Sequence, residues 1–179
     1  MQDIPNHLVI TALAPWRDNL ATALLQEIRE RGCEILDCRI GALGDALSAQ
    51  LLVSGNWSSL GKLETALPAI GAKLDAQLQG FRSKTRQERP DMRPFAVEIN
   101  APQQPDLLIH ILDFFGSHDS VVAELVCQDY NAGQTGASMV NIQLVIFIPI
   151  TAQPPAYREA FMDLCDDLNA DGILDPIKS

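Results

Sequence analysis

The sequence predicts an α+β protein with two domains, each an antiparallel four-stranded sheet with two helices on one face. In both halves the apolar patterns follow the order strand, helix, strand, strand, helix, strand, which is the ferredoxin-like split βαβ arrangement. A two-residue connection at Gly44 and Asp45 favours an antiparallel hairpin in the first half. The predicted domains span residues 5–87 and 93–179.

An internal repeat supports the division into two domains. Pro15 and Pro102 lie 87 residues apart, and five apolar pairs keep the same offset. The pairs are Leu20 with Leu107, Leu24 with Ile111, Leu25 with Leu112, Ile28 with Phe115, and Ile35 with Val122. Such matches indicate a duplication, although any two amphipathic helices align to some degree.

The first half begins with an apolar run, residues 7–14, followed by a helix-breaking segment, residues 15–19. Leucine and isoleucine then recur at helical spacing from Leu20 to Ile28. The opposite, polar face of this helix is predicted to carry Gln26, Glu27, Arg29, Glu30 and Arg31. Gly32 is expected to end the helix, because glycine accepts a left-handed backbone.

The remaining elements of the first half follow from the same patterns. Residues 33–43 form the second strand and residues 46–57 the third, after which Ser58 or Ser59 caps a helix. Pro68 predicts a kink in this helix or two short helices. The fourth strand and the linker are predicted at residues 79–86 and 87–93.

The second half repeats this order. The expected elements are a strand at residues 95–100, a helix at 106–115, a hairpin of strands at 121–130 and 140–150, a helix from Pro154 to Gly172, and a strand at 173–177.

The formal net charge of −10 and the sequence pI of about 4.6 disfavour direct DNA binding, which depends on contacts with phosphates. The only candidate basic patch consists of Arg82, Lys84, Arg86, Arg89 and Arg93. We interpret the three cations at residues 82–86 as the solvated side of an edge strand rather than as a docking patch. The chain shows no transmembrane-length apolar run and no signal-peptide pattern at its start, which predicts a cytoplasmic protein.

No catalytic or metal-binding motif is found. The four cysteines, Cys33, Cys38, Cys127 and Cys165, form no C-x-x-C pair and are expected to be buried free thiols. The histidines His7, His110 and His118 are scattered, so satisfied or exposed side chains are expected rather than metal ligands. Residues 167–175 resemble a calcium loop, but Lys178 stands where a glutamate should bind.

The best candidate binding site is the first helix-start loop, residues 16–20, which comprises Trp16, Arg17, Asp18, Asn19 and Leu20. The unpaired N–H groups of a helix N-terminus attract a carboxylate, and Arg17 is the only cation in either helix-start loop. In the second helix-start loop, residues 103–106, the corresponding segment is Gln103-Gln104-Pro105-Asp106. An ordinary helix cap remains the alternative interpretation of both loops.

The segments VITALAP, GCEILDCRIGALG, LLVSGNW, KLETALP and FAVEIN together resemble the ACT domain, a β-α-β-β-α-β module that commonly binds amino acids. The tandem arrangement is similar to the family of transcriptional repressors of the glycine cleavage system. The resemblance implies a non-enzymatic regulator that binds a DNA-binding transcriptional activator in response to a small amino acid such as glycine. It implies no direct contact with nucleic acid, and the residues themselves predict no cofactor and no membrane association. Open sheet edges would also permit a homo-oligomer.

One feature of the loops departs from the family. ACT ligand loops commonly read like D-R-P-G, whereas Asn19 and Asp106 occupy the glycine position here. Asparagine tolerates positive φ, so the first loop is expected to keep its shape, while the Asp106 carboxylate would repel a bound carboxylate. This departure supports a second hypothesis, an interaction module that has lost ligand binding. A third hypothesis is an enzyme on the same fold, such as an acyl-phosphate hydrolase that uses Arg17.

Overall fold

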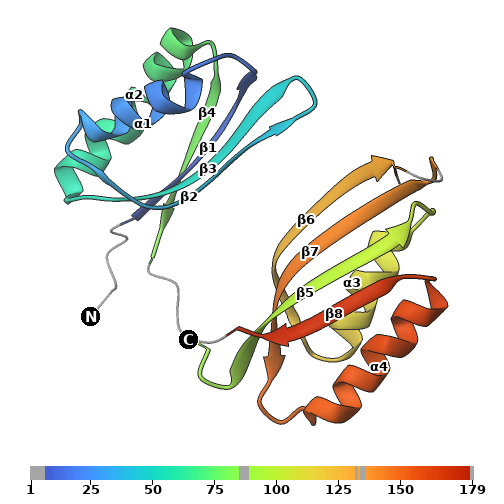
Figure 1. Cartoon of the computed structure of the whole chain (residues 1–179). Helices are drawn as coiled ribbons and strands as arrows, with labels where there is room; N and C mark the ends of the chain where they lie inside the picture. The colour runs from blue at the N-terminus through green and yellow to red at the C-terminus, as the bar shows by residue number, and fades with distance from the viewer. Residues whose placement is uncertain (1–6, 85–88, 132, 134–135, 178–179) are drawn as a thin grey trace. The chain divides into compact units, whose positions relative to one another are not determined.

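The structure is a computed structural model that describes residues 7–84, 89–131, 133 and 136–177. The chain divides into two compact units, residues 1–87 and 88–179. Each unit contains one four-stranded sheet and two helices, as Figure 1 shows. The predicted fold class, two ferredoxin-like β-α-β-β-α-β domains, is therefore confirmed.

The first unit follows the predicted element order. Its elements are β1 (His7–Pro15), α1 (Leu20–Arg29), β2 (Glu34–Leu43), β3 (Ala46–Ser54), α2 (Trp57–Leu74) and β4 (Gln77–Ser83). The sheet order is β2-β3-β1-β4, and every pairing is antiparallel.

Alternation along the strands decides which side of this sheet is buried. In β1 the side chains of Leu8, Ile10, Ala12 and Ala14 are buried, and in β3 those of Leu47, Ala49, Leu51 and Val53. Both rows pack with the apolar faces of α1 and α2 in one core, so both helices cover the same face of the sheet (Figure 1). The opposite face carries no helix.

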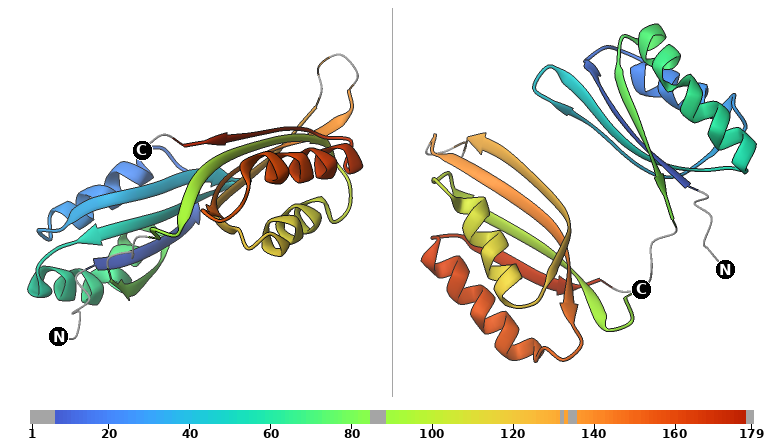
Figure 2. Two further views of the ribbon diagram at one scale, coloured as in Figure 1. Left: turned by 90° about the horizontal axis from the view of Figure 1, so that it is seen from below. Right: turned by 180° about the vertical axis from the view of Figure 1, so that it is seen from behind.

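The second unit is built in the same way. Its elements are β5 (Met92–Pro102), α3 (Leu107–Ser117), β6 (Val121–Asn131), β7 (Ser138–Pro149), α4 (Pro154–Asp167) and β8 (Asp171–Pro176). Its sheet order, β6-β7-β5-β8, matches that of the first unit. Its two helices, α3 and α4, cover one face of its sheet (Figure 2). Its core is a separate cluster that includes Phe115 and Phe161.

The internal repeat extends to irregularities of the backbone. Asn19 has φ 62° and Asp106, 87 residues later, has φ 59°. The register between the first two strands of the hairpin shifts at Leu36 in one unit and at Ala123 in the other, again 87 residues apart. Loops, helix starts and bulges therefore recur at one offset, as a duplication predicts.

The structure corrects the boundary between the third strand and its following helix. β3 ends at Ser54, and the helix cap is Asn56, whose side chain accepts a hydrogen bond of 2.8 Å from the Ser59 N–H. The predicted cap at Ser58 or Ser59 is therefore wrong. Asparagine serves here because its short carbonyl reaches the N3 amide.

Pro68 does not divide the second helix, since α2 runs without interruption over 18 residues. A proline inside a helix costs about 3 kcal/mol. The buried stripe of α2 outweighs this cost, because each fully buried aliphatic side chain contributes about 1.5–3 kcal/mol. That stripe consists of Leu60, Leu63, Leu67, Ile70 and Leu74.

Two further boundaries differ from the predictions. Met92 and Arg93, which were assigned to the linker, begin β5 and pair with Pro149 and Ile148. Gly172 lies inside β8 rather than at the end of α4, and the left-handed position after the helix belongs to Asn169, with φ 51°. Among the helices that the structure describes, none is long and apolar enough to cross a membrane.

Candidate functional site

The first helix-start loop is a tight connection between β1 and α1. The Trp16 N–H donates a hydrogen bond of 2.8 Å to the Asp45 carbonyl, which ties the loop to the β2–β3 turn. Asn19 then takes a left-handed backbone, with φ 62° and ψ 4°, and the helix begins at Leu20. The loop thus keeps the positive φ that glycine would provide, as the sequence predicted for asparagine.

The loop exposes hydrogen-bond donors at the start of α1. The Ala23 N–H donates to the Asn19 carbonyl at 2.9 Å, which closes the first helical turn. The N–H groups of Ala21 and Thr22 lie in the first turn of the helix, where no carbonyl of the helix is in place to accept a hydrogen bond from them. The Asn19 side chain forms no capping hydrogen bond, so these donors are not covered by the ordinary helix cap that was the alternative interpretation.

The side chains of the first helix-start loop surround an open hollow of about 410 Å³. Trp16 is 54% exposed, and Leu20 is buried and anchors the loop in the core. Within the described part of the chain, Arg17 forms no ion pair. The structure therefore brings all five predicted residues to one hollow, with Arg17 and the Asp18 carboxylate both exposed at it.

The second helix-start loop has the same backbone but different polar contacts. The Gln104 Nε2 donates to the Leu168 carbonyl at 3.1 Å, and Gln103 is linked to Ser138 through its side chain at 2.6 Å and its N–H at 3.1 Å. Asp106 starts α3 without a side-chain cap. The side chains of Gln103 and Gln104 thus hold the second helix-start loop to the rest of its unit, which distinguishes this loop from the first.

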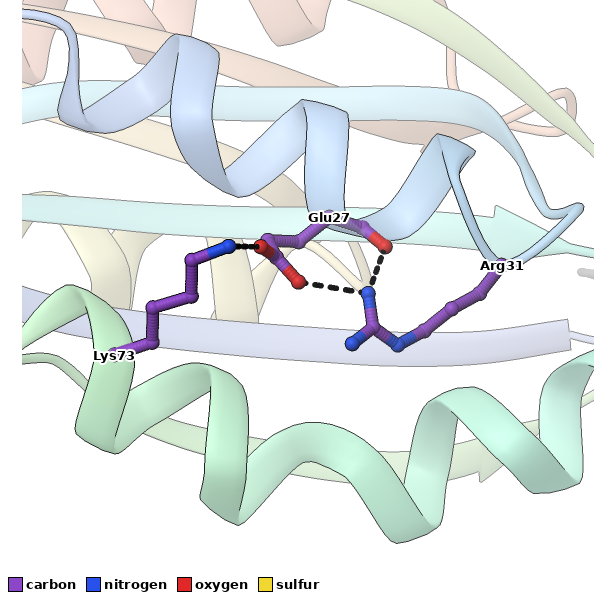
Figure 3. Close-up of polar contacts among 3 residues, drawn as sticks. All are labelled: Glu27, Arg31 and Lys73. Carbon is purple, nitrogen blue, oxygen red and sulfur yellow. Dashed lines mark hydrogen bonds and ion pairs between the residues drawn. The ribbon is translucent and has the colours of Figure 1, made fainter.

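The sequence missed a buried charged cluster next to the first unit's core. Glu27 was assigned to the polar face of its helix, yet it is only 6% exposed. Figure 3 shows its carboxylate between Lys73 of α2, which forms an ion pair with it, and Arg31, whose Nη1 lies 2.7 Å away. The i, i+4 spacing of Glu27 and Arg31 was the available signal, but Lys73 lies 46 residues away in sequence.

The hydrogen bond from Lys73 and the weaker contribution of Arg31 hold the pKa of the Glu27 carboxyl below its ordinary value of 4.5, although burial acts in the opposite direction. The carboxylate is fully partnered and connects α1 to α2. We therefore assign this cluster a structural role.

The structure corrects the prediction for the cysteines. Cys33 and Cys165 are buried free thiols as predicted, whereas Cys38 and Cys127 are exposed. Both exposed thiols lie on edge strands, β2 and β6. In both strands most residues are exposed on either face, which an alternating sequence pattern cannot show.

His7 lies in the first unit, and His110 and His118 lie in the second. His118 packs against the Phe114 ring, with centroids 4.3 Å apart, and its Nδ1 contacts the Phe114 carbonyl at 2.8 Å. His7 departs from the expected satisfied or exposed state, because it is buried and its Nδ1 has no partner among the described residues. Within those residues no group of three or more acidic, histidine or cysteine side chains could hold a metal ion. Lys178, part of the calcium-loop comparison, lies outside the described residues.

The basic edge strand is also organised differently from the prediction. β4 is an edge strand, but Arg82 forms ion-pair contacts of 2.8 and 2.9 Å with the Glu64 carboxylate on α2. Lys84 is exposed, and Arg86 lies outside the described residues. Arg82 is therefore engaged within the unit instead of being solvated.

Comparison with known proteins identifies the family. A family model described as the ACT domain matches residues 6–80. The chain is 30% identical, over 172 residues, to the glycine cleavage system transcriptional repressors of Escherichia coli (strain K12) and Shigella flexneri. These matches cover 96% of this chain and 90% of each relative.

Two solved structures have the same fold along nearly the whole chain. A candidate glycine cleavage system transcriptional repressor superposes with a TM-score of 0.71 at 24% identity, covering 97% of this chain and 98% of the other. An unknown protein from Galdieria sulphuraria superposes with a TM-score of 0.74 at 17% identity, covering 97% and 99%. The chain therefore belongs to the ACT-domain family of the glycine cleavage system transcriptional repressors.

Proposed function

We propose that this protein is a non-enzymatic regulator of transcription that acts by binding a DNA-binding transcription factor. The carrying observation is the 30% identity to two glycine cleavage system transcriptional repressors along 96% of the chain. The net charge of −10 supports action through a protein, because contacts with phosphates dominate the affinity for nucleic acid.

The proposed effector is a small amino acid, with glycine as the first candidate from the name of the relatives, and its proposed site is the first helix-start loop. The carboxylate of the amino acid would meet the N–H groups of Ala21 and Thr22, and the Arg17 guanidinium would supply a full positive charge. A helix terminus alone contributes only about 0.3–1 kcal/mol at an exposed site. The backbone donors and Arg17 must therefore act together.

Calorimetric titration of the full chain with glycine, serine, alanine and acetate tests the proposed site. We expect the Arg17→Ala variant to bind the effector at least about fivefold more weakly, because a charged hydrogen bond contributes roughly 1.5–3 kcal/mol. Gln104→Ala in the second helix-start loop is the matched control and should leave the affinity unchanged.

The control needs a stability measurement, because Gln104 donates a hydrogen bond to the Leu168 carbonyl and we expect the loss of this bond to destabilise the second unit. Equal losses of affinity in both folded variants would show that the first helix-start loop is not the specific site. Binding that neither variant changes would place the site elsewhere.

A gel shift with the operator DNA, the transcription factor and this protein tests the regulatory role. We expect a supershifted complex only when the factor is present, and a change in its stability on adding the effector. A complex that forms normally without any effect of amino acids would favour the second candidate function.

That second candidate is an ACT-type interaction module that has lost ligand binding. It is favoured by the absence of glycine from both helix-start loops, where Asn19 and Asp106 occupy the left-handed position.

The acyl-phosphate hydrolase alternative has less support, because no glycine-rich cradle surrounds Arg17 in the sequence. A colorimetric acyl-phosphate assay with no turnover above that of the Arg17→Ala variant would agree with a non-enzymatic role.

A further inference from the structure

The net charge of the chain is confined to one of its two units. In the sequence, residues 1–87 contain nine acidic and nine basic side chains, whereas residues 88–179 contain fourteen acidic and four basic ones. The second unit thus carries the whole formal charge of −10. Two copies of one ancestral module have diverged in charge, which indicates that they have different partners.

Part of this negative charge surrounds a groove on the sheet of the second unit, which we call the acidic groove. The groove has a volume of about 460 Å³. Its exposed lining residues alternate along the strands with the buried core residues, so the groove lies on the face opposite α3 and α4, the two helices that Figure 1 shows on the other side of the sheet. Its rim contains three carboxylates, and its floor contains four small or branched apolar residues. We call the three carboxylates, Glu98, Glu124 and Asp175, the rim, and the four apolar residues, Ala96, Val126, Val145 and Ile173, the floor. Glu124 and Asp175 lie on the edge strands, and Glu98 lies on the central strand β5, where it pairs with Gln143 and Ile173.

The floor of the acidic groove is open to solvent. Val126 is 51% exposed and Ile173 is 58% exposed. They belong to opposite edge strands, β6 and β8, so the apolar surface crosses the sheet from one edge to the other. Exposed apolar surface that is rimmed by polar groups is typical of an interaction site.

The rim carboxylates are held within reach of the floor. The Asn141 Nδ2 donates to the Glu98 carboxylate at 2.9 Å, which fixes its orientation on the central strand β5. Asp175 lies 3.9 Å from the Arg158 guanidinium, with both side chains more than half exposed. Such an exposed pair offsets little of the negative charge.

The corresponding face of the first unit has a different character. At the 87-residue offset, Asp37 and Arg39 occupy the positions of Glu124 and Val126, and their side chains form an ion pair of 3.3 Å. Thr11 occupies the position of Glu98. The same surface is thus neutral in one unit and acidic in the other.

We infer that the acidic groove docks a cationic amphipathic segment of the partner protein, with its apolar side chains on the floor and its Lys or Arg side chains on the rim. This inference deepens the proposed function, because it names the surface and the charge of the partner. The rim charges repel phosphates, which argues against nucleic acid and anionic membranes. They also oppose face-to-face pairing with the same groove of a second copy, since like charges at an interface are costly.

A binding assay with a defined probe tests the groove independently of the transcription factor. The probe is a fluorescent synthetic amphipathic helix of leucine and lysine, and its leucine–glutamate counterpart is the control peptide. We expect the full chain to bind the leucine–lysine helix and not the leucine–glutamate helix. Fluorescence anisotropy at low and at physiological salt measures the binding.

Two double variants with the same net charge distinguish the groove from general attraction to an acidic unit. Glu98→Gln with Asp175→Asn neutralises the rim, while Asp163→Asn with Asp166→Asn neutralises two exposed carboxylates of α4. We expect the rim variant to weaken binding roughly three- to thirtyfold, because it removes two charge pairs with the cationic helix next to the apolar floor. The α4 variant should change the affinity less than about twofold. Equal effects of both variants would overturn the proposal.

The variant Val126→Glu separates apolar docking from electrostatics. It adds a negative charge, so a purely electrostatic attraction predicts tighter binding of the cationic helix. Docking on the apolar floor predicts weaker binding instead, with circular dichroism confirming that the variant is folded. Tighter binding would overturn the proposal.

The outcome for the groove can be told apart from the outcome for the proposed function. Suppose that the transcription factor forms no complex with the protein, but that the rim variant binds the synthetic cationic helix more weakly than the wild type. The acidic groove is then supported as a docking surface, and the proposed regulatory role is wrong. If the complex with the transcription factor forms and the rim variant leaves it unchanged, the groove is not the docking surface of that partner and the proposal fails.

Discussion

At the scale of single residues, burial and partners decide what a charged side chain does. Glu27 and Arg17 lie in the same short segment of the first unit, yet Glu27 is buried between two cations and Arg17 is exposed at a hollow. The first is held in place and stabilises the unit. The second is available to a ligand, which is why the proposed site centres on it.

We expect Glu27→Gln to destabilise the first unit by about 1–3 kcal/mol at neutral pH, because hydrogen bonds to a charged group are lost in a buried site. The pKa of Glu27 is lowered by Lys73 and Arg31 in the folded state. Its contribution to stability is therefore present above pH 4.5, and it is lost as the pH falls through the lowered pKa. Urea denaturation of wild type and variant at neutral and acidic pH measures this.

The matched control is Glu64→Gln, which removes an ion pair with Arg82 at the surface. This variant should lower the free energy of unfolding by no more than about 1 kcal/mol. A loss for Glu27→Gln that is no larger than this, or that grows toward acidic pH, would contradict the buried role of the cluster.

At the scale of elements, the close approach of α4 to β8 explains a glycine that the sequence pattern placed wrongly. A Cβ at Gly172 would contact Cys165 and would lie 2.8 Å from the Phe161 ring. Both residues belong to the buried face of α4. Gly172 is therefore needed for packing the helix against the strand, while Asn169 makes the left-handed turn that ends the helix.

We expect Gly172→Ala to destabilise the second unit by about 1–3 kcal/mol, because overpacking a filled core forces its neighbours to move. Gly41→Ala on β2 is the control, since a Cβ there has no atom within 4 Å and should change stability by less than about 0.5 kcal/mol. Chemical denaturation followed by circular dichroism measures both, and tryptophan fluorescence follows the first unit alone, which holds Trp16 and Trp57. Equal stability of the two variants would show that α4 can shift away from β8 at little cost.

At the scale of the whole molecule, charge rather than shape distinguishes the two units. They share the sheet order and the helix-start geometry, but the acidic side chains are concentrated in the second. A family that duplicates a small module can thus assign ligand binding to one copy and partner binding to the other. The proposed site and the acidic groove are divided in this way.

The same charge distribution predicts that the isolated protein has no sequence-specific affinity for DNA. Arg82 of the predicted basic patch is paired with Glu64, and the acidic second unit repels phosphates. A gel shift at physiological salt without a partner protein should show no specific complex. A specific shift that survives competitor DNA would overturn this prediction.

The sequence by itself determined the fold, because hydrophobic periodicity fixes which face of each strand and helix is buried. The 87-residue repeat of apolar positions identified two units, and the resemblance carried by VITALAP and GCEILDCRIGALG identified the ACT-domain family. The first helix-start loop was also predicted as one connected site, since its residues are adjacent in the chain. Its role in binding stays a prediction.

Only the tertiary structure decided the features that depend on residues far apart in sequence. The burial of Glu27 depends on Lys73 across the helix pair, and the need for Gly172 depends on the ring of Phe161. The acidic groove joins residues of four strands, whose register sets which side chains share a face. A local sequence pattern predicts on which face of its strand or helix each residue lies. Which residues of other elements it contacts there is set by strand pairing and helix packing, and these exist only in the folded chain.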